Sequence, residues 1–200
     1  MTIAVVLADA NILFSRTLRD YVLYAAEAGA IEVRWSQQIL DEMSRNLQGR
    51  LGLSQADTDR LERLMNVYLD EALVEVEADD LAVVIGVAMD VKDRHVLAAA
   101  LSANADILVT ENVRHFPRTW MAEHDIELLT ARQLLARLTE VFPDEIRRAH
   151  HRTVRYSPKT EADILATLEG LIGTTVTDLI RAIAALPAAD LDTEAEYDRR

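Results

Sequence analysis

Short apolar runs alternate with longer amphipathic segments along the first two thirds of the chain. The runs are rich in aliphatic and β-branched residues, a pattern typical of strands that are buried on both faces. They lie at residues 3–7, 31–35, 73–76, 107–109 and 126–129. Strands that are joined by helices of ten or more residues form a parallel sheet. The sequence therefore predicts an α/β fold with a parallel sheet up to about residue 138.

The segments between these runs have apolar residues at helical spacing, and several begin at residues that favour helix N-caps. A first helix is expected over 13–26, with its end at Gly29. Further helices are expected after the N-cap residues Ser36, Ser54 and Thr130, and the helix that begins at Ser36 is expected to end near Gly49. A further helix is expected over 93–103, while the periodicity of 81–87 is ambiguous.

After residue 142 the pattern changes to helices alone, expected at 144–152, 160–171 and 176–186. We therefore expect an α/β domain over residues 1–139 and a helical extension over 140–187. The small and acidic stretch 188–200 is expected to be a disordered tail.

Composition excludes several classes of protein. The 200 residues include no Cys, which excludes disulfides, zinc–thiolate sites and thiol nucleophiles. No apolar run approaches the ~20 residues that a membrane span needs, and no basic segment precedes the first strand. These features predict a cytoplasmic protein without membrane contact.

Acidic and polar side chains gather where the expected strands end. Asp9 follows the first strand, and Thr110, Glu111 and Asn112 follow the strand at 107–109. Ligands of open parallel sheets bind at this edge, beyond the carboxyl ends of the strands. Three further acids belong to neighbouring helices, namely Glu42, Asp90 and Asp93. Each of these acids alone also has a local interpretation, such as a turn or an N-cap for Asp9 and Asp93.

Acids that gather without basic partners repel one another, so such a cluster persists when a cation binds it. Oxygen ligands without Cys or paired His favour Mg²⁺ or Mn²⁺ over zinc. The sequence therefore predicts a metal site that supports phosphoryl chemistry, with an activated water for in-line attack.

One basic run stands out in a chain whose net charge is −13. Residues 147–159 carry four arginines and one lysine but no acid; the arginines are Arg147, Arg148, Arg152 and Arg155. Such a run is typical of a solvated helix face, but in so acidic a chain we also interpret these four arginines as an RNA-contacting stripe.

Four segments, in order, carry a family resemblance: VVLADANIL (5–13), ILDEM (39–43), DVKDRHVLAAA (90–100) and ADILVTENVRHFP (105–117). They resemble the signature segments of PIN domains, especially the VapC-like toxin ribonucleases. The resemblance implies a three-layer α/β/α sandwich and an endoribonuclease that depends on Mg²⁺ or Mn²⁺. It maps the metal ligands and catalytic acids to Asp9, Glu42 and Asp93, with Asp90, Thr110, Glu111 and Asn112 as auxiliary residues.

The resemblance also implies a type II toxin–antitoxin pair, with an RNA substrate, a small antitoxin protein as partner and a homodimer. Many relatives carry an acid where this chain has Asn112. The alternative is therefore a PIN-like scaffold that has lost catalysis and binds protein or RNA. A haloacid-dehalogenase-like phosphatase would need an acid where Asn11 stands, and a phosphoreceiver domain would need a Lys after the last strand, where residues 130–132 have none.

Overall fold

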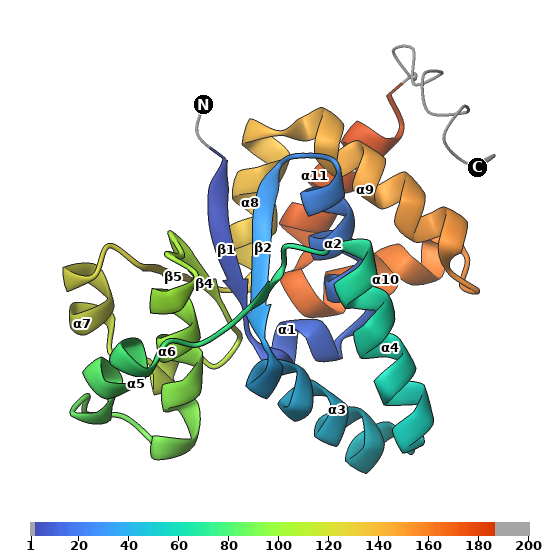
Figure 1. Cartoon of the computed structure of the whole chain (residues 1–200). Helices are drawn as coiled ribbons and strands as arrows, with labels where there is room; N and C mark the ends of the chain where they lie inside the picture. Colours follow the sequence, from blue (N-terminus) through green and yellow to red (C-terminus); the bar gives the residue numbers. More distant parts are fainter. Residues whose placement is uncertain (1–2, 187–200) are drawn as a thin grey trace.

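The computed structural model describes residues 3–186 and contains a five-stranded parallel sheet (Figure 1). The strands are β1 (Ala4–Ala8), β2 (Ile31–Ser36), β3 (Leu73–Val74), β4 (Ile107–Val109) and β5 (Glu127–Leu129). Their order in the sheet is β3-β2-β1-β4-β5, so that β1 is central. All five predicted strands are confirmed, and the predicted α/β class with them. The expected tail at 188–200 lies outside the described residues.

The first predicted helix is two helices, α1 (Ala10–Phe14) and α2 (Arg16–Glu27). Ser15 separates them in an extended conformation, and its hydroxyl accepts a hydrogen bond from the Leu18 N–H. The prediction of one helix was wrong because the apolar spacing continues across Ser15, while the N-cap bond ends one helix and begins the next. The chain then leaves α2 through Gly29, whose φ is +85°.

Helices α3 (Gln37–Leu51) and α4 (Gln55–Tyr68) pack against each other, and α3 also contacts β2. Ser36 and Ser54 cap them as predicted. The predicted end of α3 near Gly49 was wrong, because Gly49 stays helical and Gly52 takes the left-handed conformation with φ +70°. A left-handed glycine satisfies the last carbonyl groups of a helix at low steric cost.

Shorter elements follow on the other side of the sheet. They are α5 (Ala78–Ile85), the 3₁₀ turn η1 (Val91–Asp93), α6 (Arg94–Ser102), the 3₁₀ turn η2 (Val113–His115) and α7 (Arg118–Glu123). The ambiguous segment at 81–87 is therefore mainly helical. The helix expected from residue 93 begins as a 3₁₀ turn, which places Asp93 where η1 joins α6.

Four helices complete the described chain: α8 (Ala131–Val141), α9 (Pro143–Tyr156), α10 (Glu161–Ile172) and α11 (Thr174–Ala184). Figure 1 shows α9, α10 and α11 gathered around α2, away from α5 and α6. Ile146, Ile164 and Leu168 belong to the same buried cluster as Val6 of the central strand. The predicted extension therefore shares its hydrophobic core with the sheet.

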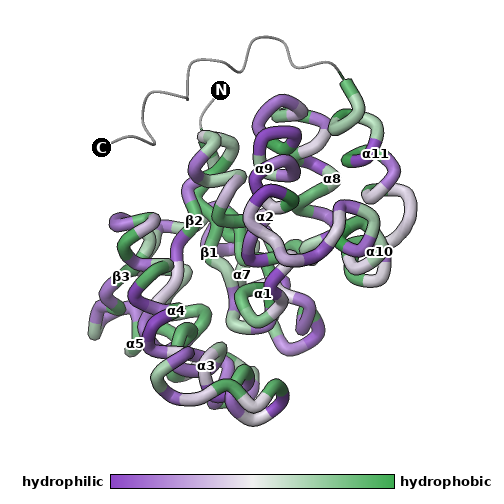
Figure 2. Tube along the Cα trace, turned by 90° about the vertical axis from the view of Figure 1, so that its right-hand side faces the viewer, coloured by the Kyte–Doolittle hydropathy of each residue, from purple (hydrophilic) through white to green (hydrophobic). Residues whose placement is uncertain are grey.

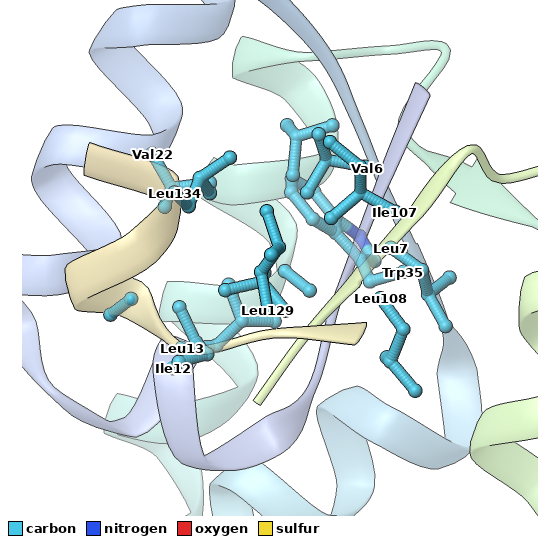
Figure 3. Close-up of a cluster of buried hydrophobic side chains, with 14 of the residues drawn as sticks. Val6, Leu7, Ile12, Leu13, Val22, Trp35, Ile107, Leu108, Leu129 and Leu134 are labelled. Carbon is cyan, nitrogen blue, oxygen red and sulfur yellow. The ribbon is translucent and has the colours of Figure 1, made fainter. Parts of the chain in front are cut away.

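The core surrounds the central strands. Figure 3 shows Val6, Leu7 and Leu108 of β1 and β4 near the buried ring of Trp35. The indole N–H of Trp35 donates to Asn66 Oδ1 at 2.8 Å, so its polar atom is satisfied. In Figure 2, hydrophobic residues dominate the trace around β1, whereas α9 carries many hydrophilic residues. No helix within residues 3–186 is long and apolar enough to cross a membrane.

Candidate functional site

Asp9 lies at the end of the central strand and begins α1. Its backbone is extended, and Oδ1 accepts a hydrogen bond from the Ala10 N–H at 2.7 Å. The residue is only 4% exposed. The N-cap interpretation of Asp9 is therefore confirmed, but an N-cap alone does not require such burial.

A closed network of hydrogen bonds holds the second oxygen of Asp9. Oδ2 accepts from the Thr110 hydroxyl at 2.6 Å and from Asn11 Nδ2 at 2.5 Å, and Asn11 Oδ1 accepts from the Glu111 N–H at 2.9 Å. The parallel pairing of β1 with β4 brings these two strand ends together. The structure thus confirms that Asp9 and Thr110 meet at the sheet edge, and it fixes the direction of the Asp9 carboxylate.

Burial raises the pKa of Asp9 above its ordinary value, and the bonds from Thr110 and Ala10 oppose this effect. Burial acts by removing water from the charged form, while donors favour that form. Asp9 is therefore a buried carboxyl group, oriented by donors from the residues that follow β1 and β4.

Glu42 and Asp93 are each paired with a histidine. His95 Nε2 lies 3.6 Å from Glu42 Oε2, and His115 Nδ1 lies 3.1 Å from Asp93 Oδ2. The other nitrogen of His95, Nδ1, lies 2.7 Å from the Lys92 carbonyl oxygen and donates to it, because a carbonyl only accepts. The predicted acids therefore do not face one another without basic partners.

Glu42 and Asp93 line a cavity of about 820 Å³ between α3 and the segment around η1. Asn11, Asn112, His95 and His115 line it as well, whereas Asp9 lies behind Asn11 and is absent from the lining. The structure thus brings four of the predicted segments to one cavity. It separates the three predicted metal ligands into a buried acid and two cavity acids.

Two of the predicted auxiliary acids serve local structure. The Asp90 carboxylate caps η1 by accepting from the Lys92 N–H, which lowers the pKa of Asp90. Glu111 Oε1 accepts from the Ala131 N–H at the first turn of α8, at 2.9 Å. Neither residue lines the cavity. For Glu111 the prediction of a site role conflicts with this geometry, because its carboxylate is directed to α8.

The predicted RNA-contacting stripe on α9 is largely used within the protein. Arg147 is 4% exposed and pairs with Asp144, while Arg148 donates to the Ala28 carbonyl oxygen. Arg152 pairs with Glu27 at 2.9 Å and lies over the Tyr24 ring. Arg155 is exposed and lies over the ring of Tyr156. The partner of Arg147 lies on α9 itself, whereas the packing of α9 against α2 brings Ala28 to Arg148 and Glu27 to Arg152. RNA contact by this stripe stays a prediction, and these contacts do not favour it for the first three arginines.

The donor set partly fits a divalent ion. Asp9, Glu42 and Asp93 offer only oxygen ligands, as Mg²⁺ and Mn²⁺ prefer. However, within residues 3–186 no three acidic or histidine side chains gather closely enough to hold a metal ion. The residue types therefore match a hard cation, while the spacing in this structure does not yet bring them together.

Comparison with known protein families matches residues 5–114 to the PIN domain. This chain belongs to the PIN-domain family. The family is one of nucleases that generally depend on a divalent metal. The matched region begins within β1 and ends within η2, and it contains every cavity residue named above except His115. No curated protein matches the chain.

Several side chains of the PIN-domain site were absent from the sequence prediction. Asn11, His95 and His115 are the partners of the predicted acids. His95 lies two residues after Asp93 and Asn11 two after Asp9, so that proximity along the chain was an available signal. Arg45 and Arg50 also line the cavity. Their helical spacing from Glu42 could have predicted that Arg45 and Arg50 lie on the same side of the helix as that acid.

Proposed function

We propose that this PIN-domain protein is a metal-dependent endoribonuclease and the toxin of a type II toxin–antitoxin pair. The observation that carries the proposal is the oriented, buried carboxylate of Asp9 behind a cavity that exposes Glu42 and Asp93. A structural N-cap has no need for two further donors or for acids across a cavity. The PIN family supplies the reaction class, and RNA is the substrate proposed for this member.

In this proposal Asp9, Glu42 and Asp93 would hold Mg²⁺ or Mn²⁺, and the ion would supply an activated water and stabilise the leaving oxygen. Thr110 and Asn11 keep Asp9 oriented. His95 lies 3.6 Å from Glu42 and His115 lies 3.1 Å from Asp93, so each of these two acids also has a histidine beside it. Asn112 on the cavity wall would be an auxiliary ligand or hold a water. Asp90, which caps η1 outside the cavity lining, would be an auxiliary acid.

The toxin role is supported by the openness of the acids. A cavity that presents Glu42 and Asp93 to solvent can be closed by an Arg or Lys from a small antitoxin protein. Such a cation gains charge-assisted hydrogen bonds in a partly desolvated position. We also propose that the active form is a homodimer and that the protein acts in the cytoplasm.

The central experiment is cleavage of labelled RNA by the purified chain with Mg²⁺, with Mn²⁺ and with EDTA. Wild type is compared with Asp93→Asn and Glu42→Gln, and with Glu140→Gln, an exposed change on α8 outside the cavity. We expect cleavage only with metal, a loss of about 100-fold or more in the two cavity variants, and no loss in Glu140→Gln. Equal rates in wild type and Asp93→Asn would contradict the nuclease.

Growth provides the test of the toxin role. Expression of wild type alone should slow growth, Asp93→Asn should not, and co-expression of the neighbouring reading frame should restore growth.

The second candidate function is a scaffold without catalysis, which is favoured by the absence of three converging ligands among residues 3–186. RNA binding with no cleavage in either Mg²⁺ or Mn²⁺ would support the scaffold and contradict the nuclease activity.

A further inference from the structure

One face of α3 forms a wall of the cavity. Glu42, Arg45, Asn46 and Arg50 follow one another at helical spacing and all line the cavity. At 1.5 Å per residue, Arg50 lies ~12 Å along the helix axis from Glu42. The wall therefore begins with a proposed catalytic acid and ends with a guanidinium group.

The two arginines of this wall are available to a ligand. Within the part of the chain that the structure describes, Arg45 is exposed and makes no ion pair or hydrogen bond. Arg50 likewise has no acidic partner there, and its guanidinium lies 5.6 Å from the centre of the Phe14 ring. Phe14 itself lines the cavity. By contrast, Arg147 and Arg152 of α9 are paired with acids of the same chain.

The charge of the cavity differs from that of the protein. The whole chain has 21 Lys and Arg against 34 Asp and Glu. The described cavity lining has as many Lys and Arg side chains (Arg45, Arg50, Lys92) as acids (Asp41, Glu42, Asp93), and two histidines in addition. Binding of a divalent ion would make this lining net positive. An acidic protein repels nucleic acid at a distance, so a polyanion must find its contacts in such a local region.

We propose that α3 carries the binding track for single-stranded RNA: phosphates contact Arg45 and Arg50, and a base stacks at the Phe14–Arg50 pair. Arginine and aromatic planes form stacking surfaces for single-stranded nucleic acid, whatever its sequence. The track leads away from Glu42, so it holds the strand beside the bond to be cut. This inference rests on the proposed function for its substrate, and it moves the RNA contact from α9 to α3.

Binding is measured without cleavage, in EDTA and in a Glu42→Gln background. The probe is a fluorescein-labelled single-stranded oligoribonucleotide of mixed sequence and about ten nucleotides. Each lost phosphate contact lowers the slope of log affinity against log salt by about 0.7 for a single strand. Arg45→Ala/Arg50→Ala should therefore flatten the slope by about 1.4 and lower the affinity at low salt by roughly tenfold.

The matched control is Arg63→Ala/Arg118→Ala, which removes the same charge from exposed positions on α4 and α7, outside the cavity. We expect it to bind as the parent does. Arg45→Ala alone, which leaves the Phe14–Arg50 contact in place, should flatten the slope by about 0.7. Unchanged binding in the α3 variants, an equal loss in the control pair, or no binding by the parent would each overturn the inference.

Cleavage separates this inference from the proposed function. With metal and Glu42 restored, Arg45→Ala/Arg50→Ala should raise KM and leave kcat nearly unchanged, since the arginines bind the strand rather than the reacting atoms. Salt-dependent RNA binding along α3 without any cleavage would support the binding track and contradict the proposed nuclease activity. Cleavage with an unchanged KM in the double variant would support the proposed nuclease activity and contradict the binding track.

Discussion

The hydroxyl of Tyr21 on α2 lies 2.5 Å from Nδ1 of His150 on α9. On the other side of the ring, His150 Nε2 lies 3.0 Å from Glu161 Oε1 on α10. A carboxylate only accepts, so Nε2–H donates to Glu161 and Nδ1 accepts from the Tyr21 hydroxyl. Burial also raises the pKa of Tyr21, which keeps its proton. This chain of bonds joins the helix that covers the sheet to two C-terminal helices.

The first prediction concerns pH. Burial lowers the pKa of His150, and the pairing with the half-exposed Glu161 opposes burial but is screened by water. The unfolded chain then binds a proton more readily than the native protein, so the free energy of unfolding falls as pH falls through about 6.5. His150→Gln should make this slope shallower by at most about 1.36 kcal/mol per pH unit.

The measurement is denaturant unfolding of wild type and His150→Gln at several pH values between 5 and 7. The difference between the two proteins cancels the contributions of Asp9 and other titrating groups that both contain. A wild type that gains stability relative to His150→Gln as pH falls would mean that Glu161 outweighs burial.

The second prediction concerns the shared core. Leu168 of α10 is fully buried in the cluster that contains Val6, whereas Leu171 on the same helix is 40% exposed. Leu168→Ala should lower the free energy of unfolding by about 2–5 kcal/mol, because it leaves a cavity. Leu171→Ala should lower the free energy of unfolding much less. Calorimetry should show one transition in both variants, and a separate early transition in Leu168→Ala would contradict a shared core.

The third prediction concerns the donors around Asp9. Asp9→Asn replaces an accepting oxygen by an NH₂ group that faces the Asn11 amide and the Thr110 hydroxyl. We expect a loss of about 1–3 kcal/mol in unfolding free energy without metal, since buried donors lose their acceptor. Asp125→Asn makes the same chemical change at an exposed position and should stay within about 0.5 kcal/mol. Equal stabilities of the two variants would contradict the network.

The fourth prediction separates Glu111 from the site. Its carboxylate accepts from the first turn of α8, so Glu111→Ala should lower the unfolding free energy by about 0.5–2 kcal/mol. RNA cleavage by the folded variant should be unchanged. A loss of cleavage with unaltered thermal unfolding would restore the site role that the sequence predicted for Glu111.

Much of the site followed from local patterns. The runs that become β1 and β4 are recognisable because strands buried on both faces need continuous apolar residues. Parallel pairing then brings their ends together, and Asp9 with Thr110 was predictable from that rule alone. The ends of α1 and α3 were less predictable, because one serine bond and one left-handed glycine decided them against the apolar periodicity.

The sequence by itself determined the strands, the edge at which the acids gather and the PIN-domain family. The tertiary structure decided which charges remain available. Arg152 has an acidic partner because α9 packs on α2, while Arg45 on α3 has none among residues 3–186. The sequence alone does not show whether a charged side chain is buried and paired or exposed to solvent. Its partner is set by helices that are far apart along the chain, and only packing brings them together.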